Sequence, residues 1–287
     1  VIPTYNNDKT IESVVKECLL YCDDIIVVAD GCTDKTMDIL KSINNITVVT
    51  YLQNKGKGYA LKMGFRKALE IGFSYAITLD GDGQHYPKDI ENFLYANQEY
   101  PHSLIIGSRQ LKNADRSKGS SFANKFSNFW FFIQTGKALE DTQTGYRLYP
   151  LRKLFALSLL TSRYEAELEL LVFASWHGVT IISIPVQVYY PPRAERISHF
   201  RPGLDFVRIS LLNTVLCFLA VVYGLPLRLL RTLFTFIRTA YSLLFFLFFT
   251  LLIFTPFVWV YTKFGKMTEK KRFRLHQLIY YSSRLVM

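Results

Sequence analysis

Apolar runs and amphipathic segments alternate from the beginning of the chain. Short continuous apolar runs, which are typical of buried strands, are followed by segments whose apolar residues recur every three or four positions. The expected strands are Ile25–Val28, Ile46–Tyr51, Tyr75–Leu79, Leu104–Gly107 and Thr180–Tyr190. The expected helices are Thr36–Ser42, Tyr59–Ile71 and Tyr164–Trp176. This β-α-β-α order predicts an α/β fold with a doubly wound, mostly parallel sheet.

Two of the expected strands run directly into carboxylates. The segment VVADGCTDKT places Asp30 at the end of one strand, and AITLDGDGQHYP places Asp80 and Asp82 at the end of another. Ligands of doubly wound sheets bind at the carboxyl ends of the strands. We therefore expect a polar ligand site where these strands end.

The second of these segments has the residue types of a cation site. Carboxylate oxygens suit hard ions such as Mg²⁺ and Mn²⁺, which keep coordination positions open for phosphate oxygens. Asp80 and Asp82 supply two carboxylates, and Gln84 adds a neutral oxygen on the same side, because alternate residues of an extended segment share a face. A solvated Asp-Gly turn is the alternative interpretation.

Two further segments offer groups for a nucleotide. Asp30 precedes a turn, where its carboxylate can accept hydrogen bonds from a nucleobase or a ribose, and Asp34 is placed to cap the next helix. The segment NKGKGYAL leads a glycine-rich backbone and Lys57 into a helix N-terminus, which suits phosphate. It lacks the GxxxxGK[ST] pattern of a P-loop, and a flexible basic turn is the alternative.

Two long uncharged segments follow the alternating part. There are 19 residues between Arg208 and Arg228, and 24 between Arg238 and Lys263. As a helix the second segment is about 36 Å long, enough to cross a bilayer core of about 30 Å. The sequence therefore predicts C-terminal membrane helices, with a buried core helix as the alternative for the second segment.

The positive charge of the chain lies mostly in this tail. The residues after Arg208 include ten Lys and Arg and a single acid, Glu269, whereas the first 208 residues are nearly neutral. Basic residues that flank apolar runs argue against nucleic acid as a partner and favour an anionic membrane surface. Six of them lie between Lys263 and Arg274, and the positive-inside tendency places this cluster in the cytosol. That favours a hairpin of two segments, or a re-entrant pair, over a single crossing.

These patterns divide the chain into three parts. We expect an α/β domain over residues 1–208, membrane-associated helical segments over 209–262 and a basic helical segment over 263–287. The four cysteines include no CxxC pair, which predicts reduced thiols and a catalytic domain on the cytosolic face.

Taken together, the motifs resemble a known family. VIPTYNN, VVADGCTDKT, NKGKGYAL, LDGDGQH, GSR at residues 107–109 and DTQTGYRLY at residues 141–149 occur in the order and spacing of family 2 glycosyltransferases. The likeness is greatest to the branch of dolichyl-phosphate mannose synthase and bacterial polyprenyl-phosphate glycosyltransferases. It covers about the first 208 residues and implies a GT-A fold with a nucleotide-sugar site.

The resemblance implies a role for particular residues. The residues that match the nucleotide-sugar site are Pro3, Tyr5, Asn6, Asp30, Lys57, Asp80, Gly81 and Asp82. The residues that match the metal site are Asp80, Asp82 and Gln84. Asp141 matches the catalytic acidic residue near the acceptor, and the residues expected at the diphosphate or the acceptor are Arg147, His199 and Arg201. Ala29 stands where relatives often have a second Asp, which leaves the nucleobase open.

The implied reaction is inverting transfer of a sugar from a nucleotide-sugar donor to a membrane lipid, with a polyprenyl phosphate expected as acceptor and Mg²⁺ or Mn²⁺ as cofactor. A phosphate acceptor is already anionic, so Asp141 would orient it or stabilise developing positive charge. If the acceptor is a lipid hydroxyl, Asp141 becomes the candidate base. A membrane scaffold with a degenerate transferase domain is a further alternative, which the intact Asp-x-Asp pattern disfavours. A sugar nucleotidyltransferase is disfavoured because IPTYNND is not a glycine-rich, arginine-containing loop.

The end of the chain resembles a different family. The segment KMTEKKRFRLHQLIYYSSRLVM is similar to the lead-in of lysophospholipid-type acyltransferase domains that are sometimes fused to such transferases. This likeness implies a fused or partner acyltransferase beyond residue 287. The HxxxxD pattern that such domains use in catalysis is absent from this segment.

Overall fold

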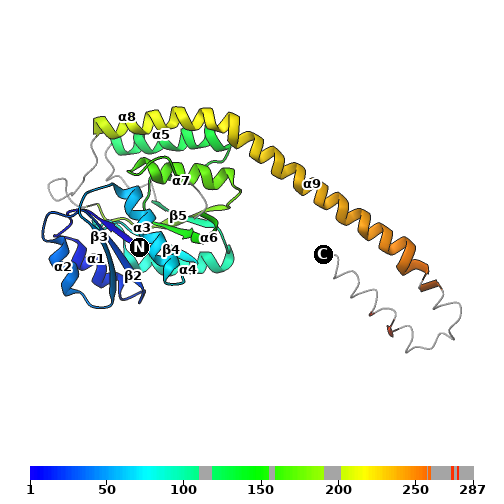
Figure 1. The fold of residues 1–287 in the computed structure, drawn as a ribbon, viewed down its shortest axis with the longest axis horizontal. Helices are drawn as coiled ribbons and strands as arrows, with labels where there is room; N and C mark the ends of the chain where they lie inside the picture. The colour runs from blue at the N-terminus through cyan, green and yellow to red at the C-terminus, as the bar shows by residue number, and fades with distance from the viewer. Residues whose placement is uncertain are drawn as a thin grey trace. The chain divides into compact units, whose positions relative to one another are not determined.

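The computed structural model describes residues 1–109, 118–154, 159–190 and 202–256, together with residues 258, 259, 273, 274 and 277. The chain divides into two compact units, Val1–Arg228 and Leu229–Met287. Figure 1 shows the strands of the first unit with helices on both sides.

The strands of the first unit form two hydrogen-bonded groups. The first group, in the order β1-β2-β3, is entirely parallel and consists of β1 (Ile2–Thr4), β2 (Ile25–Asp30) and β3 (Ile46–Tyr51). The second group, in the order β4-β6-β5-β7, consists of β4 (Tyr75–Thr78), β6 (Arg147–Pro150), β5 (Leu104–Arg109) and β7 (Ile181–Val186). In it β6 runs antiparallel to both of its neighbours, whereas β5 and β7 are parallel.

Backbone hydrogen bonds from Val1 join the two groups. The Val1 nitrogen donates to the Ile77 carbonyl oxygen at 2.7 Å, and the Leu79 nitrogen donates to the Val1 carbonyl oxygen at 3.2 Å. The order across the fold is therefore β3-β2-β1-β4-β6-β5-β7. The Asp-x-Asp segment follows β4, which places it near the middle of this array.

Helices cover both faces of the sheet because each face is apolar. One hydrophobic cluster packs the sheet against α1 (Ile11–Cys18), α2 (Thr36–Ser42) and α4 (Ile90–Glu99), the last preceded by the 3₁₀ turn η1 (Pro87–Asp89). The other cluster packs it against α3 (Lys57–Glu70), α5 (Lys118–Thr135), α6 (Leu151–Leu154), α7 (Glu165–Trp176) and α8 (Pro202–Leu219). The fold is thus a doubly wound, three-layer α/β arrangement, as the alternating pattern predicted.

The pattern predicted β2, β3, α2 and α3 closely, and it missed the helices α1, α4 and α5 and the strand β6. The bounds of α2 and β3 are those expected from the sequence. β6 begins with Arg147, and its four residues give too short an apolar run to stand out. All four of its residues are buried because β6 lies between β4 and β5.

The first uncharged segment of the tail packs on the α/β domain. Leu212 and Leu216 of α8 are buried, and α8 contacts both α5 and α7. After α8 comes a π-helical stretch, η2 (Ala220–Gly224), where a Cβ on Gly224 would lie 2.7 Å from the Trp176 ring. The first compact unit therefore continues past residue 208, to Arg228.

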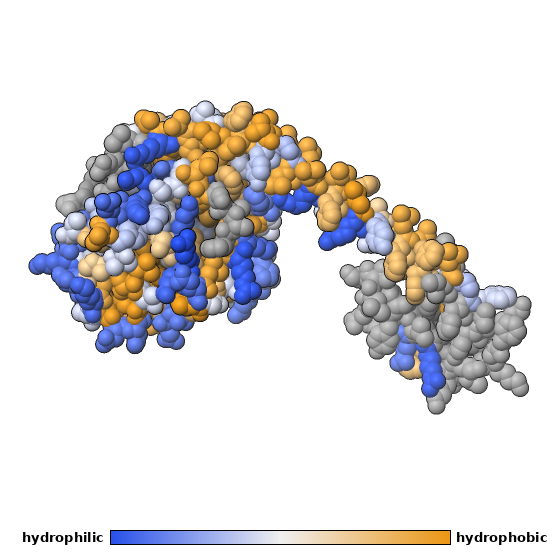
Figure 2. Space-filling model, in the orientation of Figure 1, coloured by the Kyte–Doolittle hydropathy of each residue, from blue (hydrophilic) through white to orange (hydrophobic). Residues whose placement is uncertain are grey.

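A long apolar helix continues into the second unit. The helical elements are α9 (Leu225–Phe248) and the π-helical η3 (Phe249–Phe254). Among the described residues, one helix, Phe206–Phe248, is long and apolar enough to cross a membrane. None of the residues of α9 is buried, and Figure 2 shows its surface to be largely hydrophobic. The predicted hairpin depends on residues 263–274, most of which lie outside the described ranges, so it stays a prediction.

Candidate active site

The Asp-x-Asp loop is anchored on both sides of Asp80. Before it, the Thr78 hydroxyl donates to the Gly145 carbonyl oxygen at 2.6 Å. After it, the Thr10 hydroxyl donates to the Gly81 carbonyl oxygen at 2.7 Å. The first bond comes from the end of a strand and the second from the residue before α1. Asp80 is therefore presented from a fixed backbone.

Lys57 links Asp80 to helix α7. The Lys57 ammonium lies 2.7 Å from Asp80 Oδ1 and 2.9 Å from Glu167 Oε2. Burial alone would lower the pKa of Lys57, but the two carboxylates raise it overall. Burial alone would raise the pKa of Asp80, but Lys57 lowers it overall. Both groups are therefore charged at neutral pH, and their pairing holds the loop against the N-terminus of α3.

Gly145 lies so close to this ion pair that no side chain fits there. A Cβ at this position would lie 2.6 Å from both Asp80 Oδ2 and Lys57 Nζ. The glycine of TQTGYRLY thus lets the segment that follows Asp141 contact the Asp-x-Asp loop. The two motifs, 61 positions apart at Asp80 and Asp141, meet at this point.

The second aspartate of the loop suits a divalent cation. The backbone nitrogen of Gln84 donates to Asp82 Oδ1 at 3.0 Å, which closes a turn. Burial and the negative charge of Asp80 raise the pKa of Asp82 to about 6. A cation relieves this repulsion, since it favours the charged form of a neighbouring carboxylate. Among the described residues, no group of three or more His, Cys, Asp or Glu side chains could hold a metal, so the fit rests on Asp80, Asp82 and Gln84.

His85 follows this loop and is uncharged. Its side chain is buried, its ring lies 5.1 Å from the Tyr146 ring, and its Nδ1 atom has no hydrogen-bond partner. Burial lowers the pKa of His85 to about 4. At neutral pH it adds no charge to the carboxylates beside it.

Asp30 holds the loop that leads into α3. Its Oδ1 accepts a hydrogen bond from the Lys55 nitrogen at 2.7 Å, and its Oδ2 accepts one from the Gly56 nitrogen at 2.8 Å. The residue is 3% exposed. The geometry therefore gives Asp30 a definite role in positioning the NKGKG segment. Its predicted contact with a nucleobase stays a prediction.

Three further residues expected at the nucleotide, Pro3, Tyr5 and Asn6, lie in β1 and in the loop that follows it. Pro3 is in β1, opposite Val28 of β2, and Tyr5 is half-buried just beyond the strand. Asn6 has a φ of 51°, and its Oδ1 accepts a hydrogen bond from the Thr33 nitrogen at 2.8 Å. The loops that follow β1 and β2 are thereby joined at the carboxyl ends of the strands, where a ligand is expected.

Asp141 is fully buried and forms a bidentate pair with Arg109. Arg109 Nε lies 2.6 Å from Asp141 Oδ2, and Arg109 Nη2 lies 2.8 Å from Asp141 Oδ1. The Gln143 nitrogen donates a further hydrogen bond to Oδ1 at 3.2 Å. Burial would raise the pKa of Asp141, but the hydrogen bonds and charge of Arg109 lower it overall. Asp141 is therefore a weak base held in its ionised form.

Arg147 is buried behind the site and hydrogen-bonds to two segments that form it. The residue is 0% exposed, and its guanidinium donates to the carbonyl oxygens of Glu167 at 3.0 Å and Thr142 at 2.8 Å. It thus ties α7 to the loop that contains Asp141. This placement supports an indirect role instead of the direct contact with the diphosphate or acceptor that we predicted. His199 and Arg201 lie outside the described residues.

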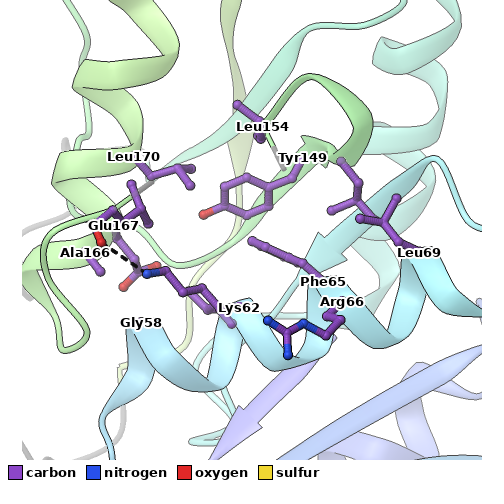
Figure 3. Close-up of a pocket in the computed structure, with 13 residues that line it drawn as sticks. Gly58, Lys62, Phe65, Arg66, Leu69, Tyr149, Leu154, Ala166, Glu167 and Leu170 are labelled. Carbon is purple, nitrogen blue, oxygen red and sulfur yellow. Dashed lines mark hydrogen bonds between the residues drawn. The ribbon is translucent and has the colours of Figure 1, made fainter. Parts of the chain in front are cut away.

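A pocket of about 190 Å³ lies beside this network, between α3 and α7 (Figure 3). Its walls are mostly apolar, with Lys62 and Arg66 at the α3 side. Glu167 belongs both to the pocket and to the Lys57 pair, and its Oε1 atom has no hydrogen-bond partner. The pocket is lined by none of the residues that we predicted for the site.

Three residues of the site were not among those we selected from the sequence. Arg109 is the last residue of the GSR motif, Gly145 lies in DTQTGYRLY, and Glu167 lies in a helix with little amphipathic character. Arg109 and Gly145 belong to motifs of the family resemblance, so those motifs could have identified them as site residues. Which atoms they contact depends on how β5, β6 and α7 are placed relative to one another in the fold. Short-range sequence patterns do not determine this placement.

The sheet order and the Asp-x-Asp loop at its centre define a GT-A glycosyltransferase fold. Glucosyl-3-phosphoglycerate synthase from Mycobacterium tuberculosis, in a complex with Mn²⁺, UDP-glucose and phosphoglyceric acid, has a similar structure. The TM-score is 0.56 at 17% sequence identity, covering 75% of this chain and 78% of that one. A complex of the same enzyme with Mg²⁺ and UDP gives a TM-score of 0.53.

The sequence comparisons agree with the fold. The model of the family "Glycosyl transferase family 2" matches residues 1–152, and the chain belongs to this family. The UDP-N-acetylglucosamine–dolichyl-phosphate N-acetylglucosaminyltransferase of Methanococcus voltae is 32% identical over 213 residues, covering 66% of this chain and 84% of that protein. The polyprenol monophosphomannose synthase of Mycolicibacterium smegmatis is 27% identical over 203 residues, covering 65% of this chain and 75% of that protein.

Proposed function

We propose that this protein transfers a sugar, with inversion, from a nucleotide-sugar donor to a polyprenyl phosphate in a membrane. The names of both relatives support a lipid-linked phosphate as acceptor and a sugar as the transferred group. The observation that carries the proposal is the state of Asp141. Its carboxylate is buried, ionised and paired with Arg109 through two hydrogen bonds.

An ionised, paired Asp141 suits an acceptor that needs no deprotonation. A phosphate monoester already carries negative charge at neutral pH, so its oxygen can attack the anomeric carbon directly. A lipid hydroxyl would need a base, and a carboxylate with a lowered pKa accepts a proton poorly. The geometry thus favours the phosphate over the hydroxyl alternative.

Arg109 is the residue best placed to bind the acceptor phosphate. Its Nε and Nη2 atoms are held by Asp141, and its side chain is 17% exposed. Pairing with a buried carboxylate fixes the plane of the guanidinium, and a fixed guanidinium matches the geometry of phosphate oxygens. Asp141 then acts as a positioning residue for Arg109 and stabilises positive charge on the sugar during transfer.

The donor diphosphate would be held on the other side of the same loop. Asp80, Asp82 and Gln84 would hold Mg²⁺ or Mn²⁺, which supplies Lewis-acid stabilisation of the departing nucleoside diphosphate. Asp80 is kept ionised by Lys57, and the N-terminus of α3 lies directly beside it. Pro3, Tyr5, Asn6 and Asp30 lie where the strands end and would contact the nucleoside. A degenerate, non-catalytic domain would have no need of this intact arrangement.

A transfer assay with matched acceptors tests the proposal. Membranes containing the full chain would be supplied with labelled nucleotide sugars and with either a polyprenyl phosphate or the corresponding polyprenol, and lipid products would be identified by mass spectrometry. We expect a divalent-cation-dependent product with the phosphate only. Transfer to polyprenol at an equal rate would contradict the assignment of the acceptor, and absence of any sugar-lipid with an otherwise active preparation would contradict the function.

We also propose that the catalytic unit faces the cytosol. The six basic residues between Lys263 and Arg274 support this orientation through the positive-inside tendency. Labelling of a cysteine introduced at Arg274 by an impermeant reagent outside intact cells would contradict it. Nothing in the matched family or in these relatives supports an acyltransferase partner, and the proposal does not include one.

A further inference from the structure

The Lys57 ammonium lies between a carboxylate of the Asp-x-Asp loop and a carboxylate of helix α7. Its Nζ atom is 2.7 Å from Asp80 Oδ1 and 2.9 Å from Glu167 Oε2. The side chains of Lys57 and Glu167 are only 15% and 9% exposed, so water contributes little to either group. An ammonium group has three donors and can pair with two carboxylates at once. One positive charge is therefore shared between the proposed metal loop and α7.

A cation that binds Asp80 would compete with Lys57. Lys57 holds Oδ1 of Asp80, and Oδ2 faces Gly145, where a Cβ would lie 2.6 Å away. A divalent cation thus approaches a carboxylate that already has a protein neighbour at each oxygen. It also brings two positive charges close to the ammonium, and like charges repel one another strongly in a partly buried site. Binding of the cation is therefore favoured if Lys57 can move away from Asp80 and still remain paired.

Glu167 can accept the Lys57 ammonium with both of its oxygens. Its Oε2 atom already pairs with Lys57, whereas its Oε1 atom is buried and has no hydrogen-bond partner among the described residues. A buried carboxylate oxygen without a partner is unfavourable, and a second hydrogen bond from the ammonium would satisfy it. The side chain borders the pocket of about 190 Å³ between α3 and α7, which leaves the carboxylate room to turn (Figure 3).

The backbones that carry Lys57 and Glu167 are fixed next to each other. The starts of α3 and α7 are in close contact, because a Cβ on Gly58 would collide with the Cβ of Ala166. The Arg147 guanidinium donates to the Glu167 carbonyl oxygen at 3.0 Å, which fixes α7 at this point. A change in the pairing of Lys57 therefore needs only side-chain rotation, and Glu167 stays within its reach.

We propose that Glu167 is a positioning residue for the metal site, which takes up the Lys57 ammonium when a divalent cation binds Asp80. Before the cation binds, Lys57 compensates the charge of Asp80. When the cation takes over that role, the ammonium moves to the two oxygens of Glu167, and α3 stays attached to α7. The inference rests on the proposed metal site, and it adds a residue that sets the affinity for the ion without touching it.

The neighbouring glutamates of α7 do not share this arrangement. Glu165, Glu167 and Glu169 are all buried. Glu169 Oε2 accepts a hydrogen bond from the Thr161 nitrogen at 2.9 Å and so holds the loop before α7. Glu165 resembles Glu167 in having one oxygen without a partner among the described residues, but the α7 carboxylate that pairs with Lys57 is that of Glu167. Glu165 is therefore a matched control for burial and charge.

Titration with Mn²⁺ alone tests the proposal without relying on any catalytic activity. The full chain in detergent micelles would be titrated at neutral pH, and free Mn²⁺ would be measured from its electron paramagnetic resonance signal. Glu167→Gln should weaken Mn²⁺ binding about tenfold, which is within the range of coupling between contacting charged groups. Glu165→Gln should change the affinity by less than about twofold. Chemical denaturation would check that each variant folds like the parent.

Lys57→Met separates the proposed role of Glu167 from a general effect of its negative charge. Direct attraction between Mn²⁺ and the Glu167 carboxylate does not need Lys57, whereas the proposed role does. In the Lys57→Met background, Glu167→Gln should therefore change the affinity for Mn²⁺ by less than about twofold. A tenfold weakening in that background, or the same weakening in Glu165→Gln, would show that any negative charge on α7 has this effect and would overturn the proposal.

An experimental structure of the parent protein with Mn²⁺ gives a second test that needs no variant. We expect Lys57 Nζ within hydrogen-bond distance of both Glu167 oxygens and beyond that distance from Asp80 Oδ1. Lys57 still bonded to Asp80 Oδ1 with Mn²⁺ in place would overturn the proposal. A parent protein that binds no Mn²⁺ would refute the metal site and this inference together. Unchanged affinity in Glu167→Gln, with a parent that does bind Mn²⁺, would refute the role of Glu167 alone.

Discussion

Arg109 and Asp141 form a bidentate ion pair that joins the end of β5 to the loop before β6. Nε and Nη2 of the guanidinium lie 2.6 and 2.8 Å from the two carboxylate oxygens. Because Asp141 is fully buried, the pair defines a fixed position for Arg109 at the edge of the site. This pairing favours an electrostatic role for Asp141 over the role of a general base.

Asp141→Asn should lower kcat by about 10²-fold and leave the affinity for nucleoside diphosphate nearly unchanged. The amide cannot match both guanidinium nitrogens as an acceptor, so Arg109 loses its orientation at the acceptor, and misplacement of this kind has effects of that size. Steady-state kinetics and calorimetric titration would measure the two quantities. Arg109→Lys, which cannot form the bidentate pair, should likewise lower kcat and leave the affinity for nucleoside diphosphate nearly unchanged. A loss of nucleotide affinity with an unchanged kcat would contradict the acceptor-side assignment.

Asp82→Ala should abolish metal-dependent binding of nucleoside diphosphate while the fold stays intact. The residue lies in a loop beyond β4, and its carboxylate makes a local turn with Gln84. Calorimetric titration of nucleoside diphosphate with Mn²⁺ would measure the binding, and circular dichroism would check the fold. An unchanged Mn²⁺-dependent affinity in the variant would refute the metal assignment.

Binding of Mn²⁺ should weaken as the pH falls below about 6. The pKa of Asp82 is raised to about 6 by burial and by Asp80, so below that pH the carboxyl retains a proton that the metal must displace. The association constant should then fall by about tenfold per pH unit, and it should level off above pH 6. Titrations between pH 5 and pH 7.5 would measure this slope. The same slope in Asp82→Asn would assign it to another group.

Gly145→Ala should damage both folding and nucleotide binding. Its Cβ would lie 2.6 Å from Asp80 Oδ2 and Lys57 Nζ, so the ion pair has to separate or the loop has to move. Overpacking of this kind costs about 1–3 kcal/mol of unfolding free energy. Chemical denaturation would measure the loss. Gly203→Ala is the control, because a Cβ there meets nothing within 4 Å, and it should leave stability and nucleotide binding nearly unchanged.

The sequence alone determined the class of fold and located the Asp-x-Asp loop that we propose as the metal site. Strands such as β2 and β3 and helices such as α2 follow from short-range periodicity, since each buries a face that repeats every two or every 3.6 residues. The Asp-x-Asp loop could be found because its residue types and spacing are local. The order of the motifs also indicated the family, which the comparison over residues 1–152 confirmed.

Only the tertiary structure decided which groups face one another. Arg109 reaches Asp141 because β5 and β6 are neighbours, and Glu167 reaches Lys57 because the start of α7 lies beside the start of α3. Arg147 looked like a ligand in the sequence but is buried, because β6 is an interior strand. The first uncharged segment read as a membrane helix, and one side of it packs on α5 and α7. An apolar sequence specifies burial from water, and the surrounding structure decides whether protein or lipid provides it.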